Sequence, residues 1–399
     1  MRILAFSHAG HPSGFGVAAH HLYRRWVEAG HQVHVLAAHC PKEPPPLPYT
    51  LHPTRLDASE EVYGTQLAGP LIARLDPHVL FFLYDLPVAG LYLDRIATQG
   101  ELRPWLERTV LYAPLDYVNL PPHWFRPVAT VRRTVMQSRW AAQTIRREGG
   151  LDADWAWLGV DRGLFHPATS SDPVRLKDAA GRKLALSSKE EAKRLLDLEG
   201  RFLVLAVSAN HGRKNLADTI KVFAAFAADK PDALLFLHAN PVANGIDLLA
   251  VVSRLGIRAK VRFPNDYGLV EDWPPSHLAA LYNAADVYLS TSCGEGFGLS
   301  LAEALACALP IVAQDFSAMP EVIGDGGILT PPERLRTCGN GADLSLPRLE
   351  PMVEALERLY HSLELRLELS GKAVRQARAF SWDVSASRIL AALQEAAGP

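Results

Sequence analysis

Two glutamates, Glu295 and Glu303, lie in the stretch of this chain whose residue types could best do chemistry. The stretch, residues 291–303, reads Thr-Ser-Cys-Gly-Glu-Gly-Phe-Gly-Leu-Ser-Leu-Ala-Glu and lies between two short apolar runs. This pattern predicts a strand, a glycine loop, a helix over residues 299–308 that Pro310 ends, and a second, parallel strand. Such a loop lies at the carboxyl edge of a sheet, where glycine N–H groups and the helix terminus favour a phosphate.

The two carboxylates of this stretch need partners if they are buried, and sugar hydroxyls are suitable partners. Glu303 lies among apolar residues of the predicted helix, so we expect it to point to the mouth of a cleft. The alternative is that Glu295 only favours the helix N-terminus electrostatically and that Glu303 is a solvated helix residue.

A basic pair, Arg213 and Lys214, follows another apolar run. The predicted order is a strand over residues 202–207, a short loop, and a helix over residues 216–228. Cations at the carboxyl end of a strand are placed to meet a phosphate, and Asn215 could cap the helix. The alternative is an exposed pair of cations at a helix start.

The N-terminus also predicts strand, loop and helix, over residues 2–6, 7–15 and 16–29. Gly14 opens the sequence Gly-Phe-Gly-Val-Ala-Ala, which imitates a dinucleotide-binding fingerprint. We reject a nicotinamide site because several residues separate the strand from this glycine. The next strand, over residues 32–38, also ends without an acidic residue.

Two later strands of this half end in acids, Asp85 and Asp116. Both would lie at the carboxyl edge of the sheet and face the same crevice as Gly14. The alternative is that each is a turn or cap residue. The strands expected here are residues 78–83, 109–112 and 134–137.

Histidines and cysteines are residue types that could hold a metal. The histidines near the first loop are His8, His11, His20 and His21. We expect them to pack or cap, because carboxylate or thiolate ligands occur only far away in the sequence. The four cysteines have no Cys-x-x-Cys spacing, which favours a reducing cytoplasm over disulfides or a zinc site.

Composition limits the remaining possibilities. The chain has 399 residues, of which 48% are hydrophobic and 21% charged, as expected of a globular protein with two or three domains. A formal charge of −2 argues against a broad nucleic-acid surface. No apolar run approaches the roughly 20 residues that a membrane span needs, so at most peripheral membrane contact is expected.

The segment Glu295-Gly-Phe-Gly-Leu-Ser-Leu-Ala-Glu303, followed by Leu-Pro-Ile-Val-Ala, resembles the signature of family 4 of the GT-B glycosyltransferases. The resemblance implies an α/β fold of two Rossmann-like, doubly wound domains that face a central cleft. It also implies a retaining, hexosyltransferase-type enzyme without a cofactor. The donor would be a nucleotide sugar, UDP- or GDP-linked, and the acceptor a hydroxyl of a glycan, a lipid or a small molecule.

The resemblance also implies roles for individual residues. Glu303 would hold the nucleotide ribose. Glu295 would hold the donor sugar, together with the backbone that follows it, namely Gly296, Phe297, Gly298 and Leu299. The loop around Gly14 would approach the donor phosphates, and Asp85 and Asp116 would lie on the acceptor side.

The chain departs from the family pattern at two positions. Ala209 stands where an arginine is usual, so we expect Arg213 to share the charge with Lys214, which matches the phosphate-binding lysine. With Glu295 these two are the expected catalytic residues. No metal is expected, because the cations and the helix terminus can neutralise a departing diphosphate. Ala308 stands where a glycine usually ends the helix, which leaves the geometry of that cap open.

The resemblance sets the domain limits as well. Residues 157–167 resemble the interdomain segment of the family and predict an N-terminal acceptor domain over residues 1–167. A donor domain over residues 168–378 and a final helix over residues 379–399, packed back on the first domain, would follow. Two other functions stay open: a nucleotide-sugar epimerase on the same fold and a non-catalytic sugar-nucleotide-binding subunit.

Overall fold

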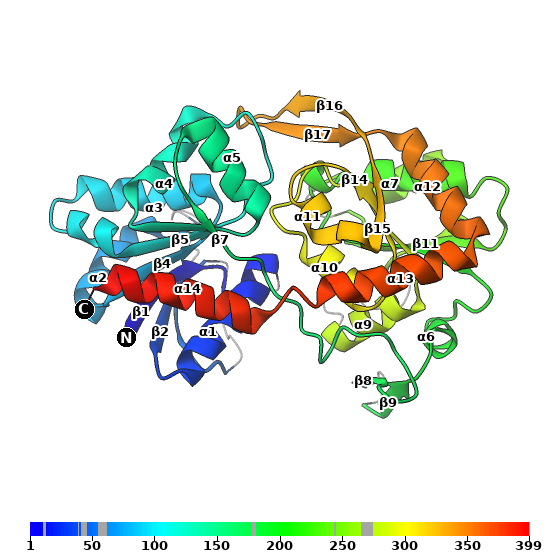
Figure 1. Cartoon of the computed structure of the whole chain (residues 1–399), viewed down its shortest axis with the longest axis horizontal. Coiled ribbons are helices and arrows are strands. Elements are labelled where there is room, and N and C mark those ends of the chain that lie inside the picture. Colours follow the sequence, from blue (N-terminus) through cyan, green and yellow to red (C-terminus); the bar gives the residue numbers. More distant parts are fainter. Residues whose placement is uncertain are drawn as a thin grey trace. The chain divides into compact units, whose positions relative to one another are not determined.

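The computed structural model describes residues 1–10, 13–38, 40, 46–54, 62–177, 181–242, 245–264 and 274–398. They form two compact units (Figure 1). Unit 1 comprises Met1–Gly159, Cys338–Ala342 and Ser381–Pro399, and unit 2 comprises Val160–Thr337 and Asp343–Phe380. The chain enters unit 2 after Gly159, eight residues before the end of the N-terminal domain drawn from the sequence.

Unit 1 is built on a seven-stranded parallel sheet with the order β3-β2-β1-β4-β5-β6-β7. Its strands are β1 (Arg2–Ser7), β2 (Gln32–Ala37), β3 (Thr50–Pro53), β4 (Val79–Leu83), β5 (Thr109–Ala113), β6 (Arg133–Met136) and β7 (Asp154–Trp155). The central strands are continuous apolar runs because helices cover both faces of a parallel sheet. The helices are α1 (Gly14–Glu28), α2 (Ala68–Leu75), α3 (Leu86–Thr98), α4 (Phe125–Thr130), α5 (Arg139–Gly149) and α14 (Trp382–Ala397).

Helix α1 begins two residues earlier than its sequence suggests, at Gly14. The hydroxyl of Ser13 accepts a hydrogen bond from the Gly16 N–H and caps the helix, so the glycine pair lies in its first turn. Val17 is 39% exposed and lies outside the buried face of the helix. The buried face is instead formed by Ala18, Ala19, Leu22, Tyr23 and Trp26.

The final helix, α14, belongs to unit 1 and lies along α1, β4 and β5 (Figure 1). The Trp26 indole donates to the Ala386 carbonyl at 3.1 Å. Trp382 stacks on His21 with ring centroids 4.7 Å apart. These contacts fix the C-terminal segment to the first helix of the chain.

Unit 2 contains a six-stranded parallel sheet with the order β12-β11-β10-β13-β14-β15. The strands are β10 (Phe202–Val207), β11 (Ala233–His238), β12 (Val261–Arg262), β13 (Val287–Ser290), β14 (Ile311–Gln314) and β15 (Gly327–Thr330). Two antiparallel pairs lie outside it: β8 (Val174–Lys177) with β9 (Lys183–Leu186), and β16 (Pro332–Thr337) with β17 (Asp343–Pro347). The helices are α6 (Lys189–Leu195), α7 (Leu216–Phe226), α8 (Leu248–Arg254), α9 (Pro275–Ala284), α10 (Leu299–Ala306), α11 (Met319–Ile323), α12 (Leu349–His361) and α13 (Leu363–Ala377).

The two parallel sheets confirm the α/β class and the two Rossmann-like domains expected from the sequence, with element bounds that differ by a few residues. Across the described ranges, no helix is both long and apolar enough to cross a membrane.

Candidate functional site

The glycine loop of unit 2 connects β13 to α10 at the carboxyl edge of the sheet, between the ends of β10 and β14. Gly298 has a φ of +93°, and a Cβ there would meet the Leu301 side chain at 2.8 Å. A glycine is therefore required where the loop turns into the helix. The phenyl ring of Phe297 is buried and packs edge-on against Phe380 at 5.2 Å, so its side chain is part of the core.

Glu295 is buried, with 6% of its surface exposed, and both its backbone N–H and its carboxylate are hydrogen-bonded. Its backbone N–H donates to the Ser317 hydroxyl at 2.8 Å. The Lys214 ammonium donates to both carboxylate oxygens, at 2.6 and 2.8 Å, and the Arg213 guanidinium donates to Oε2 at 3.1 Å. Burial opposes ionisation, but the charges of Lys214 and Arg213 outweigh it and lower the pKa of Glu295 to about 2.

The cations reach Glu295 from the end of the neighbouring strand, β10. Arg213 and Lys214 lie in a short 3-10 turn, Gly212–Lys214, before α7. Arg213 also donates to the Gly294 carbonyl and so holds the loop at two successive residues, Gly294 and Glu295. The structure therefore brings together the three residues expected to be catalytic.

The expected cap at Asn215 is not formed. Its φ is +54°, and its side chain makes no cap hydrogen bond. The amide nitrogen donates to the Asp218 carboxylate at 2.8 Å. The left-handed backbone turns the chain from the basic pair into α7 instead.

Glu303 lies one turn into α10 and is half-buried. The Tyr282 hydroxyl, from α9, donates to its Oε2 at 2.9 Å. This is the one hydrogen bond that its carboxylate makes to the described part of the chain. Burial raises the pKa of Glu303 to about 7, and the Tyr282 hydrogen bond only partly opposes that rise.

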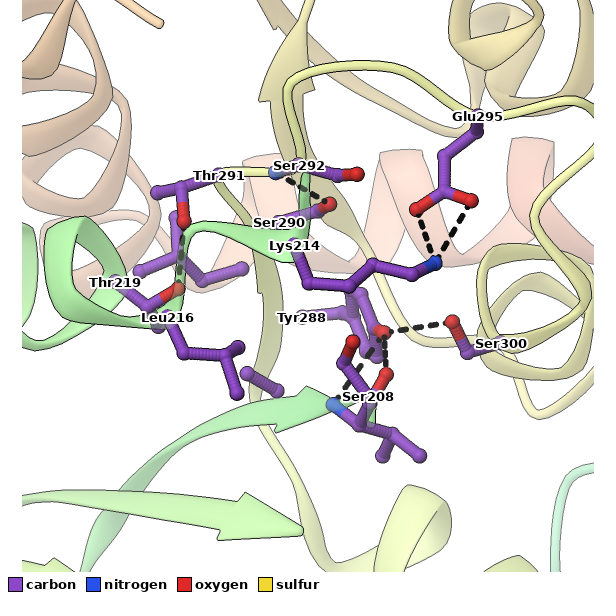
Figure 2. A pocket seen from close by; sticks show the side chains of 13 residues that line it. Ser208, Lys214, Leu216, Thr219, Tyr288, Ser290, Thr291, Ser292, Glu295 and Ser300 are labelled. Carbon is purple, nitrogen blue, oxygen red and sulfur yellow. Dashed lines mark hydrogen bonds and ion pairs between the residues drawn. The ribbon is translucent and has the colours of Figure 1, made fainter. Parts of the chain in front are cut away.

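A small pocket lined mostly by hydroxyl groups lies beside Lys214 (Figure 2). The Tyr288 hydroxyl bonds the Val207 carbonyl and the Ser300 hydroxyl, both at 2.9 Å. The hydroxyl-bearing residues of the lining are Ser208, Thr219, Tyr288, Ser290, Thr291, Ser292 and Ser300. Four of these hydroxyls, those of Ser208, Tyr288, Thr291 and Ser292, donate to backbone carbonyls.

Two buried polar residues, Gln314 and Ser345, make hydrogen bonds to the backbone of the glycine loop. The Gln314 amide donates to the Ser292 carbonyl at 2.5 Å and to the Ser345 carbonyl at 3.0 Å. The Ser345 N–H donates to the Cys293 carbonyl at 3.0 Å. Sequence reasoning missed this pair and Tyr282, because their only signal is a polar residue within or beside an apolar run.

Helix α10 is followed by Ala308 where a glycine is usual, and the backbone at Ala308 is nevertheless left-handed. Ala308 has a φ of +60°, and the N–H groups of Ala308 and Leu309 bond back to Leu305 and Ala304. Alanine is strained in this region, and the site upstream is formed nonetheless.

The remaining predicted residues lie in unit 1. Gly14, Asp85 and Asp116 follow β1, β4 and β5, which are neighbours in the sheet, so all three lie at its carboxyl edge. Asp85 stands at the N-cap position of α3, but its side chain makes no cap hydrogen bond. Both aspartates are half-buried.

Among the described residues, the histidines near the first loop pack against aromatic rings. His8 packs against Phe15 and Tyr84, with ring centroids 5.6 and 5.1 Å away, and His21 stacks on the last helix. His11 lies outside the described residues. Within those residues no group of three or more side chains could hold a metal.

Part of the chain is similar to known proteins. Residues 201–340 match the family described as glycosyl transferases group 1. The Actinosynnema mirum D-inositol 3-phosphate glycosyltransferase is 30% identical over 247 residues, or 60% of this chain and 50% of that protein. The Segniliparus rotundus protein of that name is 28% identical over 254 residues, 60% of this chain and 46% of its own. The chain thus spans about half the length of the curated relatives it matches.

Solved structures show the same fold over almost the whole chain. Thermosynechococcus elongatus sucrose-phosphate synthase has a TM-score of 0.74 at 16% identity and covers 99% of this chain and 98% of its own. Anabaena HepE, in complex with UDP and glucose, has a TM-score of 0.71 at 15% identity and covers 98% and 99%. The fold is GT-B. Residues 201–340, which match the group 1 glycosyltransferases, contain the glycine-loop signature of residues 295–303.

Proposed function

We propose that the chain is a retaining, metal-independent glycosyltransferase. It would move a sugar from a nucleotide-diphosphate sugar, UDP- or GDP-linked, to a hydroxyl of a glycan, lipid or small-molecule acceptor. The observation that carries this proposal is the meeting of Arg213, Lys214 and Glu295 at the carboxyl edge of the unit 2 sheet. These residues lie beside a hydroxyl-lined pocket and inside the region that matches the family.

The cations account for the leaving group. As the glycosidic bond of the donor breaks, negative charge grows on the diphosphate, so fixed cations there bind the transition state more tightly than the ground state. Arg213 compensates for Ala209, since it reaches the same carboxylate as Lys214. The proposal needs no metal for this reason.

Glu295 and Glu303 would divide the donor between them. Glu295 keeps its charge and, once a diphosphate engages the cations, its oxygens can accept from sugar hydroxyls. A carboxylate with a pKa of about 2 is a poor base. This fits retention better than an inverting reaction in which Glu295 deprotonates the acceptor. Glu303 would accept from the ribose.

The names of related proteins support the partners. The curated relatives are named for D-inositol 3-phosphate, and HepE was solved with UDP-glucose. By analogy the acceptor would carry free hydroxyls, and Asp85, Asp116 and Gly14 would act on its side in unit 1. The four cysteines have no Cys-x-x-Cys spacing, which supports a reducing, cytoplasmic setting.

The test is donor turnover. The protein would be given UDP-, GDP-, ADP- and TDP-linked sugars with an acceptor panel, and release of the nucleoside diphosphate would be followed with and without EDTA. We expect acceptor-dependent release that EDTA leaves unchanged, and a product whose anomeric configuration, read by proton NMR couplings, equals that of the donor. Conversion of the donor without acceptor would indicate an epimerase, and binding without turnover a non-catalytic subunit.

A further inference from the structure

Tyr282 makes the contact that fixes Glu303 in unit 2. Its hydroxyl donates to Oε2 at 2.9 Å, whereas Glu303 Oε1 makes no hydrogen bond to the described residues. The two side chains come from different helices, α9 and α10, so the bond is a tertiary contact. One carboxylate oxygen is therefore held and the other is left for a ligand.

The phenol itself is rigidly placed. Only 1% of Tyr282 is exposed. Phe165 packs edge-on against its ring at 5.8 Å, and Tyr288 stacks on it at 6.2 Å. A buried ring held by two others has little rotational freedom, so its hydroxyl is preorganised toward Glu303.

The titratable groups that face Glu303 are all neutral at pH 7. They are Tyr282 on α9, Tyr288 on β13 and Cys307 at the end of α10, and burial raises the pKa of each. Within the described ranges no cation contributes to the ionisation of Glu303. A single neutral hydrogen bond is thus the polar contact that favours its carboxylate form.

We propose that Tyr282 is a positioning residue of the donor site. By holding Oε2 of Glu303, it leaves Oε1 to accept hydrogen bonds from the vicinal hydroxyls of a nucleoside diphosphate ribose. The inference rests on the function proposed above, because it takes the nucleotide to be the ligand of Glu303.

The contact has a pH signature. The ionised carboxylate is the better acceptor for a diol, and Glu303 titrates near neutrality. Nucleotide affinity should therefore weaken as the pH falls from about 8 to about 6. Removal of the phenol hydroxyl takes away the hydrogen bond that favours ionisation and moves this profile to higher pH.

The test uses Tyr282→Phe, which keeps the ring packing. Its matched control is Tyr360→Phe, which removes another phenol–carboxylate hydrogen bond of unit 2, to Asp232 at 2.9 Å. Calorimetric titration with UDP and GDP should give affinities about fivefold weaker for Tyr282→Phe at pH 7 and less than about twofold weaker at pH 9, as a pKa rise of about one unit from about 7 requires. The control should follow the parent profile. A loss that is equal at both pH values, or an unchanged profile, would overturn the inference.

A second measurement separates this inference from the proposed function. Carbon-13 NMR of glutamate-labelled protein, with the Glu303 signal assigned by its loss in Glu303→Gln, gives the carboxyl titration without any ligand. In one outcome, the titration midpoint moves upward in Tyr282→Phe while the parent protein binds no nucleotide. That result would support the effect of Tyr282 on Glu303 and refute the nucleotide as the ligand of Glu303. An unmoved midpoint would refute the role of Tyr282 whatever the protein binds.

Discussion

Glu295 and Glu303 are eight positions apart in the sequence, in one loop and the helix that follows it, and yet their surroundings are opposite. Glu295 meets two cations, and its pKa falls to about 2. Glu303 meets one phenol, and its pKa rises to about 7. The difference comes from the turn after β10, which carries the two cations, and from α9, which carries the phenol. The charge state of a motif residue is set by the elements that the fold brings to it.

The two glutamates also affect stability with opposite signs. The pKa of Glu295 is lower in the folded state than the ordinary 4.5, so its stabilisation is complete above pH 4.5 and is lost as the pH falls toward 2. The pKa of Glu303 is higher in the folded state, so the folded protein keeps a proton that the unfolded chain has released. Stability therefore falls as the pH rises from 4.5 to about 7.

The largest effect is expected on turnover. Arg213→Ala and Lys214→Ala each remove one of the two cations that pair with Glu295. Each removes a charge-assisted contact worth about 2 to 4 kcal/mol in the transition state, so turnover should fall roughly 30- to 1,000-fold. Lys221→Ala, which removes an exposed pair with Asp218, is the matched control and should stay within a fewfold. Near-parental rates for both variants would show that the leaving group is handled elsewhere.

Glu295→Gln removes the negative charge that pairs with Arg213 and Lys214. It leaves Arg213 and Lys214 without a countercharge and should lower the free energy of unfolding by about 3 kcal/mol at pH 7. The difference from the parent should shrink below pH 4. Turnover with the intact sugar donor should be lost as well. Thermal melts over pH 3 to 8 measure the first effect, and a constant difference across that range would contradict the ion-pair account.

Glu303→Gln should act in the opposite direction. A glutamine cannot ionise, so it removes the cost of a charged carboxylate beside a single phenol, and the ligand-free protein should gain about 1 to 2 kcal/mol at pH 8. At pH 5, where Glu303 holds its proton, parent and variant should melt together. A destabilised variant at pH 8 would mean that Glu303 is ionised by a partner other than Tyr282.

The smallest effect is expected from Ala308→Gly, which changes the end of the Glu303 helix without altering either carboxylate. Relief of the left-handed alanine should add about 1 kcal/mol and raise the melting midpoint by about 2 °C. Turnover and nucleotide affinity should not change. A lower midpoint would show that the φ of +60° carries no strain.

Sequence reasoning reached the fold and the two glutamates because glycine spacing and apolar runs are local signals. The basic pair was predicted for the same reason, because the end of an apolar run locates Lys214 at the strand end even when its partner, Glu295, is unknown. The hydrogen bonds from Tyr282 to Glu303 and from Gln314 to Ser292 could not be predicted, because they depend on helix packing and strand order. The expected Asn215 cap was wrong because its amide bonds Asp218 instead.

The central claim is that Glu303 serves the nucleotide and Glu295 the sugar. Calorimetric titration of UDP and GDP into the parent, Glu303→Ala and Glu295→Gln at pH 8 tests it most directly. If Glu303 makes charge-assisted bonds to the ribose, its loss should weaken the bound nucleotide by roughly 1.5 to 3 kcal/mol. Glu295→Gln should retain nucleoside diphosphate binding. Unchanged affinity in Glu303→Ala, or an equal loss in both variants, would contradict the division of roles.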